Sequence, residues 1–240
     1  MTTLFIADLH LDEAQPEIGE QLSEFIAAEG LQAEALYILG DLFESWVGDD
    51  DPQAERSRVA SLLNDLAARG IPVFIMRGNR DFLLSDRFAR ECGATLLDDE
   101  VVVELYGERV LLMHGDSLCT DDHEYQAFRT TVRDPAWQQQ VLAQPLQARL
   151  ALAQQARQRS RERNANAPEQ IMDVNDEAVS AVMRKHGVQT LLHGHTHRPA
   201  VHEFELNGKP ARRIVLGDWY DQGSTVTWDA NGFELRFLPR

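Results

Sequence analysis

The chain has 240 residues, of which 43% are hydrophobic and 26% are charged, and its formal net charge is −16 at pH 7. This length is enough for one domain whose core needs no disulfide or structural metal. Nucleic-acid backbones are bound mainly through basic surfaces, so the acidic balance argues against a nucleic-acid partner, although bound cations would still attract an anionic substrate. The apolar runs are short compared with the ~20 residues of a membrane-spanning helix, which predicts a soluble protein.

The amino-terminal stretch MTTLFIADLHLDE lacks a basic flank, a long apolar run and a small-residue cleavage site. We therefore expect no signal peptide. Cys92 and Cys119 stand at no spacing typical of a metal or redox motif, which suits a reducing compartment. These features together predict a cytoplasmic protein.

The front part of the chain alternates strand and helix patterns. Strands are expected at residues 4–7, 35–39 and 72–76, and helices at 16–29 and 52–69, where apolar residues recur at helical spacing. Gly70 follows the second helix as a stop signal. Because strands that alternate with helices pair in parallel through right-handed crossovers, this part predicts a parallel sheet.

The pattern changes after residue 100. Three hairpins are expected, at 101–113, at 201–216 about Asn207-Gly208, and at 226–237 about Asn231-Gly232. Residues 121–186 carry little strand signal and many helix formers, and we interpret them as a helical insertion, or lid, over the carboxyl ends of the strands. The whole chain thus predicts a single α/β domain with two mixed sheets packed together and helices outside.

Polar side chains follow five of the expected strands, at the point where each strand ends. In open α/β sheets, ligands bind in the crevice outside the carboxyl ends of the strands, where such loops converge. Residues two apart in an extended segment point the same way, as in the pairs DLH and HTH. The residues at these strand exits are Asp8, His10, Asp41, Asn79, His114, His195 and His197.

Oxygen and imidazole donors without thiolate suit manganese, iron, zinc or cobalt. Seven donors are too many for one ion that keeps a water, but they suffice for two ions about 3.5–4 Å apart that share a carboxylate, an arrangement typical of phosphoryl transfer. Any one of these motifs alone is more simply a turn or a hydrogen-bonded histidine, whereas five together favour a metal site. Asp218, in VLGDW, lies outside the ordered series and is interpreted as a turn residue, and His193 as a residue that orients its neighbours.

The motifs DLH, GDLFE, GNRD, HGD and GHTH, in this order, resemble those of the calcineurin-like metallophosphoesterase family. The resemblance implies a four-layered α/β/β/α fold. It also implies two metal ions, one held by Asp8, His10, Asp41 and His197 and the other by Asp41, Asn79, His114 and His195, with Asp41 as the bridge.

The chain departs from many family members at Arg80, where they carry a histidine thought to protonate the leaving group. Arginine stays protonated and cannot act as a general acid, but it can hold a phosphate group through two hydrogen bonds. An alkoxide leaving group needs a proton, whereas a phosphate leaving group does not. Arg80 therefore favours cleavage of a diphosphate over cleavage of a phosphomonoester.

The GNRD variant, the stretches DLFESWVGDD and HGDSLCTDD, and the insertion most resemble the family members that hydrolyse UDP-2,3-diacylglucosamine in bacterial lipid A biosynthesis. This resemblance implies water attack on the α-phosphorus, release of UMP and 2,3-diacylglucosamine 1-phosphate (lipid X), and two Mn²⁺ ions as cofactor. It implies catalytic roles for Asp41, Asn79, Arg80 and His195. The substrate-binding residues it suggests are Asn79, Arg80, Asp122, Tyr125, Arg157, Ser160, Asn164 and His195, while Ala167 stands where relatives often have lysine.

A diacylated substrate requires an apolar cleft and access from a membrane, and the insertion contains candidates for both. Leucines could line an acyl groove, and a basic run could face anionic lipid head groups, which implies peripheral attachment to the cytoplasmic face of the inner membrane. From the residues alone, the alternatives are ordinary helix packing and a solvated helix face. The leucines are Leu142, Leu146, Leu150 and Leu152, and the arginines are Arg149, Arg157, Arg159, Arg161 and Arg163.

Two other functions remain open at this point. One is a different dinuclear-metal phosphodiesterase acting on nucleotides, either cyclic nucleotides or dinucleoside polyphosphates. Arg80 and the insertion argue against the cyclic-nucleotide enzyme. The other is a non-catalytic scaffold of the same fold, against which the complete set of seven donors argues. No obligate protein partner is indicated.

Overall fold

The computed structural model describes residues 2–164 and 173–239, apart from the side chains of residues 161, 163 and 164. The first sheet has the strand order β11-β10-β1-β2-β3-β4. Its parallel strands are β1 (Thr3–Ile6), β2 (Ala35–Leu39), β3 (Val73–Met76) and β4 (Thr95–Leu97), and β10 (Gly223–Asp229) and β11 (Gly232–Leu238) continue it antiparallel. The second sheet has the order β5-β6-β7-β9-β8 and consists of β5 (Glu100–Leu105), β6 (Glu108–Met113), β7 (Thr190–His193), β8 (Ala200–Leu206) and β9 (Lys209–Val215).

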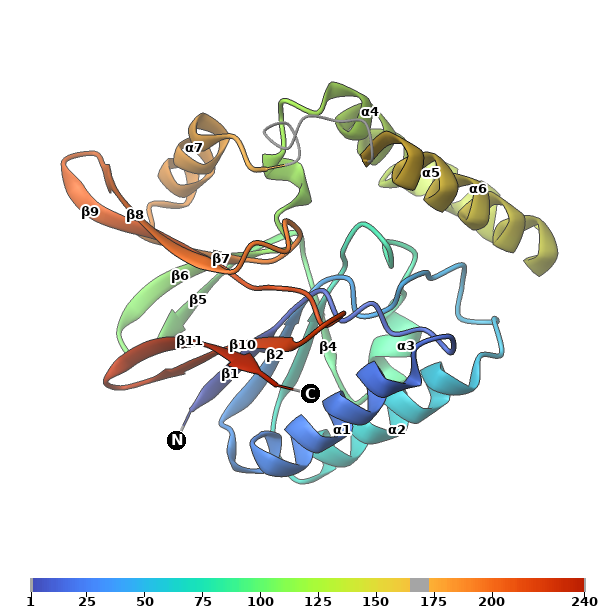
Figure 1. Cartoon of the computed structure of the whole chain (residues 1–240), viewed down its shortest axis with the longest axis horizontal. Coiled ribbons are helices and arrows are strands. Elements are labelled where there is room, and N and C mark those ends of the chain that lie inside the picture. Colours follow the sequence, from blue (N-terminus) through green and yellow to red (C-terminus); the bar gives the residue numbers. More distant parts are fainter. Residues whose placement is uncertain (1, 165–172, 240) are drawn as a thin grey trace.

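The two sheets pack face to face with helices on both outer sides (Figure 1). The helices α1 (Pro16–Ala28), α2 (Ala54–Ala68) and α3 (Asp86–Glu91) cover the first sheet, and α7 (Asp176–His186) covers the second. One buried cluster lies between the sheets, where Phe5 and Leu39 meet Leu112 and Ile214. The predicted α/β/β/α arrangement of two mixed sheets is confirmed.

The expected strands and helices of the front part are present within a few residues of their predicted bounds. The sequence interpretation missed α3 and β4, because six-residue and three-residue elements are too short to show a periodic pattern. Ser85 begins α3 by accepting a hydrogen bond from the Arg87 backbone N–H, and the left-handed Gly187 ends α7.

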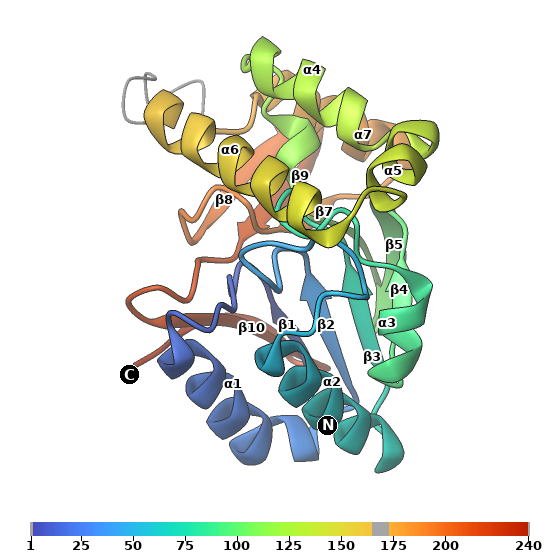
Figure 2. The same ribbon diagram turned by 90° about the vertical axis from the view of Figure 1, so that its right-hand side faces the viewer.

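The predicted helical insertion divides into two parts. The helices α4 (His123–Val132), α5 (Pro135–Leu142) and α6 (Leu146–Asn164) lie beyond the carboxyl ends of β1, β2 and β3 (Figure 2). The last helix, α7, instead packs its Val179 and Met183 side chains on the second sheet as an outer layer of the sandwich. In the part of the chain that the structure describes, no helix combines the length and the apolar content needed to cross a membrane.

Two contacts anchor α4 and α6 to the sandwich. On α4, Arg129 donates to Asp116 at 2.8 Å and to Asp99 at 2.7 Å. On α6, the buried Arg149 pairs with Asp50 in the loop between β2 and α2, at 2.7 Å. The insertion is therefore held to the loops beneath it at α4 and at the start of α6.

Candidate metal centre

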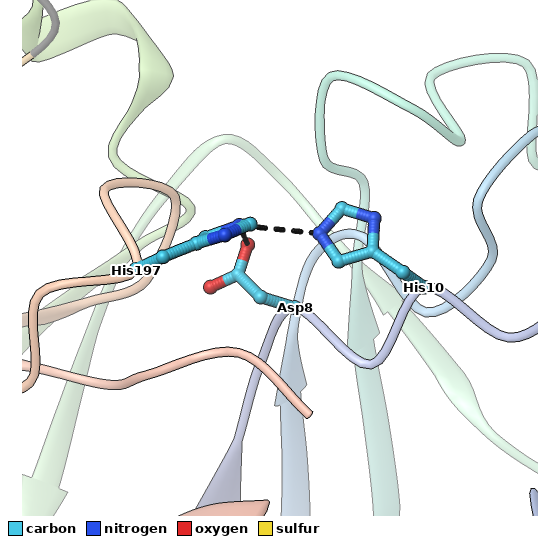
Figure 3. Close-up of side chains that lie close together, drawn as sticks. All are labelled: Asp8, His10 and His197. Atoms are coloured by element: carbon cyan, nitrogen blue, oxygen red, sulfur yellow. Dashed lines mark hydrogen bonds and ion pairs between the residues drawn. The ribbon is translucent and has the colours of Figure 1, made fainter. Parts of the chain in front are cut away.

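The seven strand-exit residues predicted as ligands gather in one place. His10 Nε2 lies 3.2 Å from His197 Nε2, which is 3.5 Å from Asp8 Oδ1 (Figure 3). On the other side, Asn79 Oδ1 lies 2.9 Å from His114 Nε2 and 2.7 Å from His195 Nδ1. Side chains up to 189 positions apart in the sequence thus meet at the carboxyl ends of strands from both sheets.

The gathering follows from backbone pairing that continues past the ends of the strands. The N–H of Asp8 donates to Gly40 O at 3.1 Å, the N–H of His10 donates to Asp41 O at 3.0 Å, and the N–H of Gly194 donates to His114 O at 2.9 Å. Each loop is therefore held in register with its neighbour. The pairing of the strands thus fixes the positions of the functional side chains.

Asp41 lies between two groups of donor atoms. Its Oδ2 is 3.8 Å from His10 Nε2, and its Oδ1 is 3.7 Å from His114 Nε2. Two sets of donor atoms each lie within 4.8 Å of one another, one formed by Asp8, His10 and His197, and the other by Asp8, Asp41 and His114. Carboxylate, carboxamide and imidazole donors at this spacing have the chemistry to hold two divalent cations.

Five of the seven residues adopt left-handed backbone conformations. Positive φ angles between 50° and 70° occur at Asp8, His10, Asp41, His195 and His197. Such angles are uncommon outside glycine, and residues in strained backbone cluster at functional sites because the surrounding structure must hold them there. The unfavourable backbone angles at the strand exits thus serve to place the side chains.

Glycine precedes several of these residues because another ligand occupies the space of its missing side chain. A Cβ atom on Gly78 would lie 2.1 Å from Asp41 Oδ1, and a Cβ atom on Gly194 would lie 2.3 Å from Asp8 Oδ2. The Gly78-Asn79 and Gly194-His195 pairs in the sequence therefore reflect close approach between loops.

The histidines differ in their protonation. Burial lowers the pKa of His195, helped by the nearby His114, to about 3, so its imidazole is neutral and able to bind a cation. Burial alone would also lower the pKa of His197, but contacts with Asp218 and Asp8 outweigh it and raise that pKa to about 10. Among the described residues, the buried Asp8 Oδ1 has a 3.5 Å contact with His197 Nε2 and no other hydrogen-bond partner. A buried carboxylate oxygen and a neutral imidazole that both face the cluster fit a bound cation.

Two carboxylates in this region were missed as functional residues. Asp218 does form the predicted turn, accepting from the Tyr220 N–H at 3.0 Å, but its other oxygen lies 3.2 Å from His197 Nδ1. Glu44 lies 3.1 Å from His10 Nδ1. Asp218 follows a strand and a glycine, as other site residues do, so the sequence pattern that marks the site was present there. Glu44 differs from an ordinary acidic loop residue only by its place in GDLFE. His193 Nδ1 contacts Gly194 O at 2.8 Å, inside the loop that carries His195.

A cavity of about 320 Å³ opens beside the cluster and extends under α4, α5 and α6. Its polar end includes five residues that the sequence interpretation assigned to the substrate, and its apolar walls come from the insertion and from the loops beneath it. The polar residues are Asn79, Arg80, Tyr125, Arg157 and Ser160, and the apolar ones include Trp46, Val47, Phe82, Phe128, Trp137 and Leu152.

The other predicted substrate residues lie elsewhere. Asp122 is buried and caps α4, accepting from the Tyr125 N–H at 2.8 Å. His195 is not among the cavity-lining residues and stacks on Tyr125 with ring centroids 5.9 Å apart. The side chain of Asn164 and all of Ala167 lie outside the described residues.

Tyr125 lines the cavity, and its hydroxyl donates to Asp116 at 2.7 Å.

The leucines and arginines of the insertion divide into several groups. Leu152 lines the cavity, whereas Leu142, Leu146 and Leu150 are not among its lining residues. Arg149 lines it too, but its guanidinium is only 4% exposed and bound to Asp50, so this arginine is a structural anchor and not a free surface cation. Arg157 and Arg159 lie at the cavity, and the side chains of Arg161 and Arg163 lie outside the described residues.

Residues 1–199 match the family model for the calcineurin-like phosphoesterase. Over their full lengths, the chain is 51% identical to the UDP-2,3-diacylglucosamine hydrolase of Stenotrophomonas maltophilia (strain R551-3) and 53% identical to that of Escherichia coli O157:H7. Among solved structures, an archaeal phosphodiesterase is similar in fold, with a TM-score of 0.50 at 12% identity over 99% of this chain and 100% of the archaeal one.

Proposed function

Because the chain belongs to the calcineurin-like phosphoesterase family, we propose that the strand-exit cluster is a hydrolytic centre and that its substrate is UDP-2,3-diacylglucosamine. The chain is a metal-dependent phosphoesterase of the hydrolase class. Water attacks the α-phosphorus, the bond from that phosphorus to the bridging oxygen breaks, and the products are UMP and 2,3-diacylglucosamine 1-phosphate. The reaction belongs to lipid A biosynthesis, as the full-length hydrolase relatives support.

One observation carries this proposal: the donor cluster and the apolar cavity share a residue. Asn79 contacts His114 and His195 through its Oδ1 atom and also lines the cavity. A substrate with its diphosphate at the cluster would therefore extend its acyl chains under the insertion. This combination suits an acylated nucleotide sugar better than a soluble nucleotide.

The ions would be held in two sets. Asp8, His10, Asp41 and His197 hold the first, and Asp41, Asn79, His114 and His195 hold the second, with Asp41 shared because its two oxygens face opposite histidines. Mn²⁺ suits these oxygen and nitrogen donors. When bound, two such ions supply Lewis acidity towards phosphate oxygens and lower the pKa of a water molecule.

Arg80 positions the phosphate group. Its backbone N–H donates to Asp41 Oδ1 at 2.7 Å, so the residue is fixed to the cluster, and its side chain lines the cavity. The guanidinium donates to the phosphate oxygens and favours the charge that develops on them. It does not protonate the leaving group, and a departing sugar phosphate does not require a proton.

The mouth of the cavity faces the membrane. Phe128 on α4 and Leu152 on α6 line the cavity and are 42% and 39% exposed, so apolar surface continues from the cavity to the outside. Arg157 and Arg159 lie on the same helix as Leu152 and suit anionic head groups. The enzyme therefore attaches peripherally to the cytoplasmic face of the inner membrane, where the diacylated substrate resides.

Hydrolysis in oxygen-18 water tests the reaction. Mass spectrometry of the products should find the label in the phosphate of UMP. Label in the sugar phosphate instead would contradict attack at the α-phosphorus. Turnover of soluble nucleotides without turnover of UDP-2,3-diacylglucosamine would favour a nucleotide phosphodiesterase.

A further inference from the structure

The two histidines of the first donor set each contact a carboxylate through the ring nitrogen that faces away from the cluster. His10 Nδ1 lies 3.1 Å from Glu44 Oε2, and His197 Nδ1 lies 3.2 Å from Asp218 Oδ2. Their Nε2 atoms face each other at 3.2 Å (Figure 3). Each imidazole is therefore held between a carboxylate on one side and the shared donor cluster on the other.

Tyr220 connects the two carboxylates. Its hydroxyl donates to Glu44 Oε2 at 3.2 Å, and its backbone N–H donates to Asp218 Oδ1 at 3.0 Å. Its ring stacks on the imidazole of His10, with centroids 5.0 Å apart and planes 12° apart. One residue thus restrains both carboxylates and one of the rings.

The segment that carries Asp218 and Tyr220 is itself fixed to the site loops. The N–H of Leu216 donates to His193 O at 2.8 Å, and the N–H of Trp219 donates to Asp8 O at 3.1 Å. The Trp219 side chain is fully buried in the core. Because the chain is held on both sides of Asp218, at Leu216 and at Trp219, its carboxylate has little freedom to leave His197.

The second donor set is supported differently. The outer nitrogen of His114, Nδ1, contacts the backbone oxygen of Leu39 at 2.9 Å. A backbone carbonyl is a neutral acceptor, whereas the first set is backed by two carboxylates. His10 and His197 are therefore backed by carboxylates at Nδ1, whereas His114 is backed there by a neutral backbone carbonyl.

We propose that Glu44, Asp218 and Tyr220 form an outer clamp that sets the cation affinity of the first donor set. A carboxylate placed at Nδ1 of a histidine, as Glu44 and Asp218 are at 3.1 and 3.2 Å, keeps the Nε2 lone pair directed at the cation and makes it a stronger ligand. The clamp residues are positioning residues, acting through His10 and His197. The inference depends on the proposed two-ion site.

Titration of the full-length, metal-stripped chain with Mn²⁺ tests the clamp. Calorimetry should find two ions bound by the parent chain, and Asp218→Asn should weaken one of them by about 10- to 100-fold while the other is unchanged. Electron paramagnetic resonance at an intermediate Mn²⁺ concentration should then show an isolated ion in the variant, where the parent shows a coupled pair. Asp221→Asn is the matched control, since it removes the same charge from an exposed position on the same loop.

Tyr220→Phe provides a second, milder variant that keeps the stacked ring and removes the hydroxyl that holds Glu44. It should weaken the same ion by less than Asp218→Asn does. Unchanged affinity in both variants, beside a parent that binds two ions, would overturn the clamp and leave the proposed function intact. If both ions bound equally more weakly and the metal-free chain had a lower melting temperature, the three residues would support the fold in general, and the clamp would be overturned. A parent that binds no Mn²⁺ would overturn the proposed function itself.

Discussion

The strand-exit loops and the helical insertion are built on different principles. In the loops, backbone hydrogen bonds between neighbouring strand exits fix each side chain, together with left-handed backbone conformations at residues such as Asp8 and His197. The insertion is attached through Arg129 and Arg149, and together with the loops beneath it lines a cavity that has both apolar and polar residues in its walls. In the proposed reaction, the loops would supply the chemistry and the insertion would select the substrate.

The largest effect is expected from Asp41→Ala, which removes the carboxylate between the two donor sets. Both cations should be lost or bound far more weakly. Turnover should fall by more than about 100-fold, because substitution of residues that only support the ligands typically costs about 10- to 100-fold. Metal analysis after dialysis, together with the hydrolysis rate, measures this. A variant that kept its ions and its rate would remove the bridging role from Asp41.

Gly78→Ala is expected to impair the same loops without removing any ligand. The added methyl group would lie 2.1 Å from Asp41 Oδ1, so the loop or the carboxylate must move, and a shift of about 1 Å can cost about 10²-fold in rate.

Gly70→Ala is the matched control for Gly78→Ala. A Cβ atom at Gly70 meets nothing within 4 Å, but the residue has a φ of 85°. This control should lower the melting temperature and leave the rate unchanged. If Gly78→Ala only lowered the melting temperature as well, the loops would be more tolerant than the structure indicates.

Arg80→Ala should leave the cations in place and slow the reaction by about 10²-fold, because the phosphate loses its positioning group. Arg80→Lys keeps the charge but not the planar pair of donors, so it should recover only part of the rate. Steady-state kinetics beside metal analysis separates the two effects. Full activity in Arg80→Ala would exclude a phosphate contact.

The smallest effect concerns the insertion. Leu152→Asn should raise KM for the diacylated substrate by about 10-fold, the equivalent of about 1.4 kcal/mol of lost apolar contact. Leu142→Asn is the control, because Leu142 is equally exposed, at 41% against 39%, but does not line the cavity. Equal effects of the two substitutions would indicate a general membrane contact in place of an acyl groove.

The sequence predicted the position of the strand-exit cluster well, because strand patterns are local and the carboxyl ends of parallel strands meet at one edge. Asp218 was underestimated even though it follows a strand and a glycine. Its partner depends on the order of strands, in which β9 lies next to β7, so that their exits are neighbours. The strand order arises in the folded sheet, and the local residue pattern does not reveal it.

The cavity was predicted less well, for a related reason. The leucines of α6 form no single stripe, so their spacing does not show which of them faces inward. Most of the apolar wall comes from distant residues such as Trp46, Phe82 and Trp137. Arg149 looks like its neighbours in a basic run, but burial against Asp50 gives it a different role. Only the tertiary structure distinguishes these cases.

The left-handed backbone at the strand exits limits the residue types that these positions accept. Aspartate, asparagine and histidine are the non-glycine residues that tolerate such angles best, and they are also common cation ligands. The exchange of one of these three for another at Asp8 or His197 would therefore keep the loop conformation while changing the donor atom. The fold can in this way alter its preferred ion through single substitutions, without rebuilding the framework that carries them.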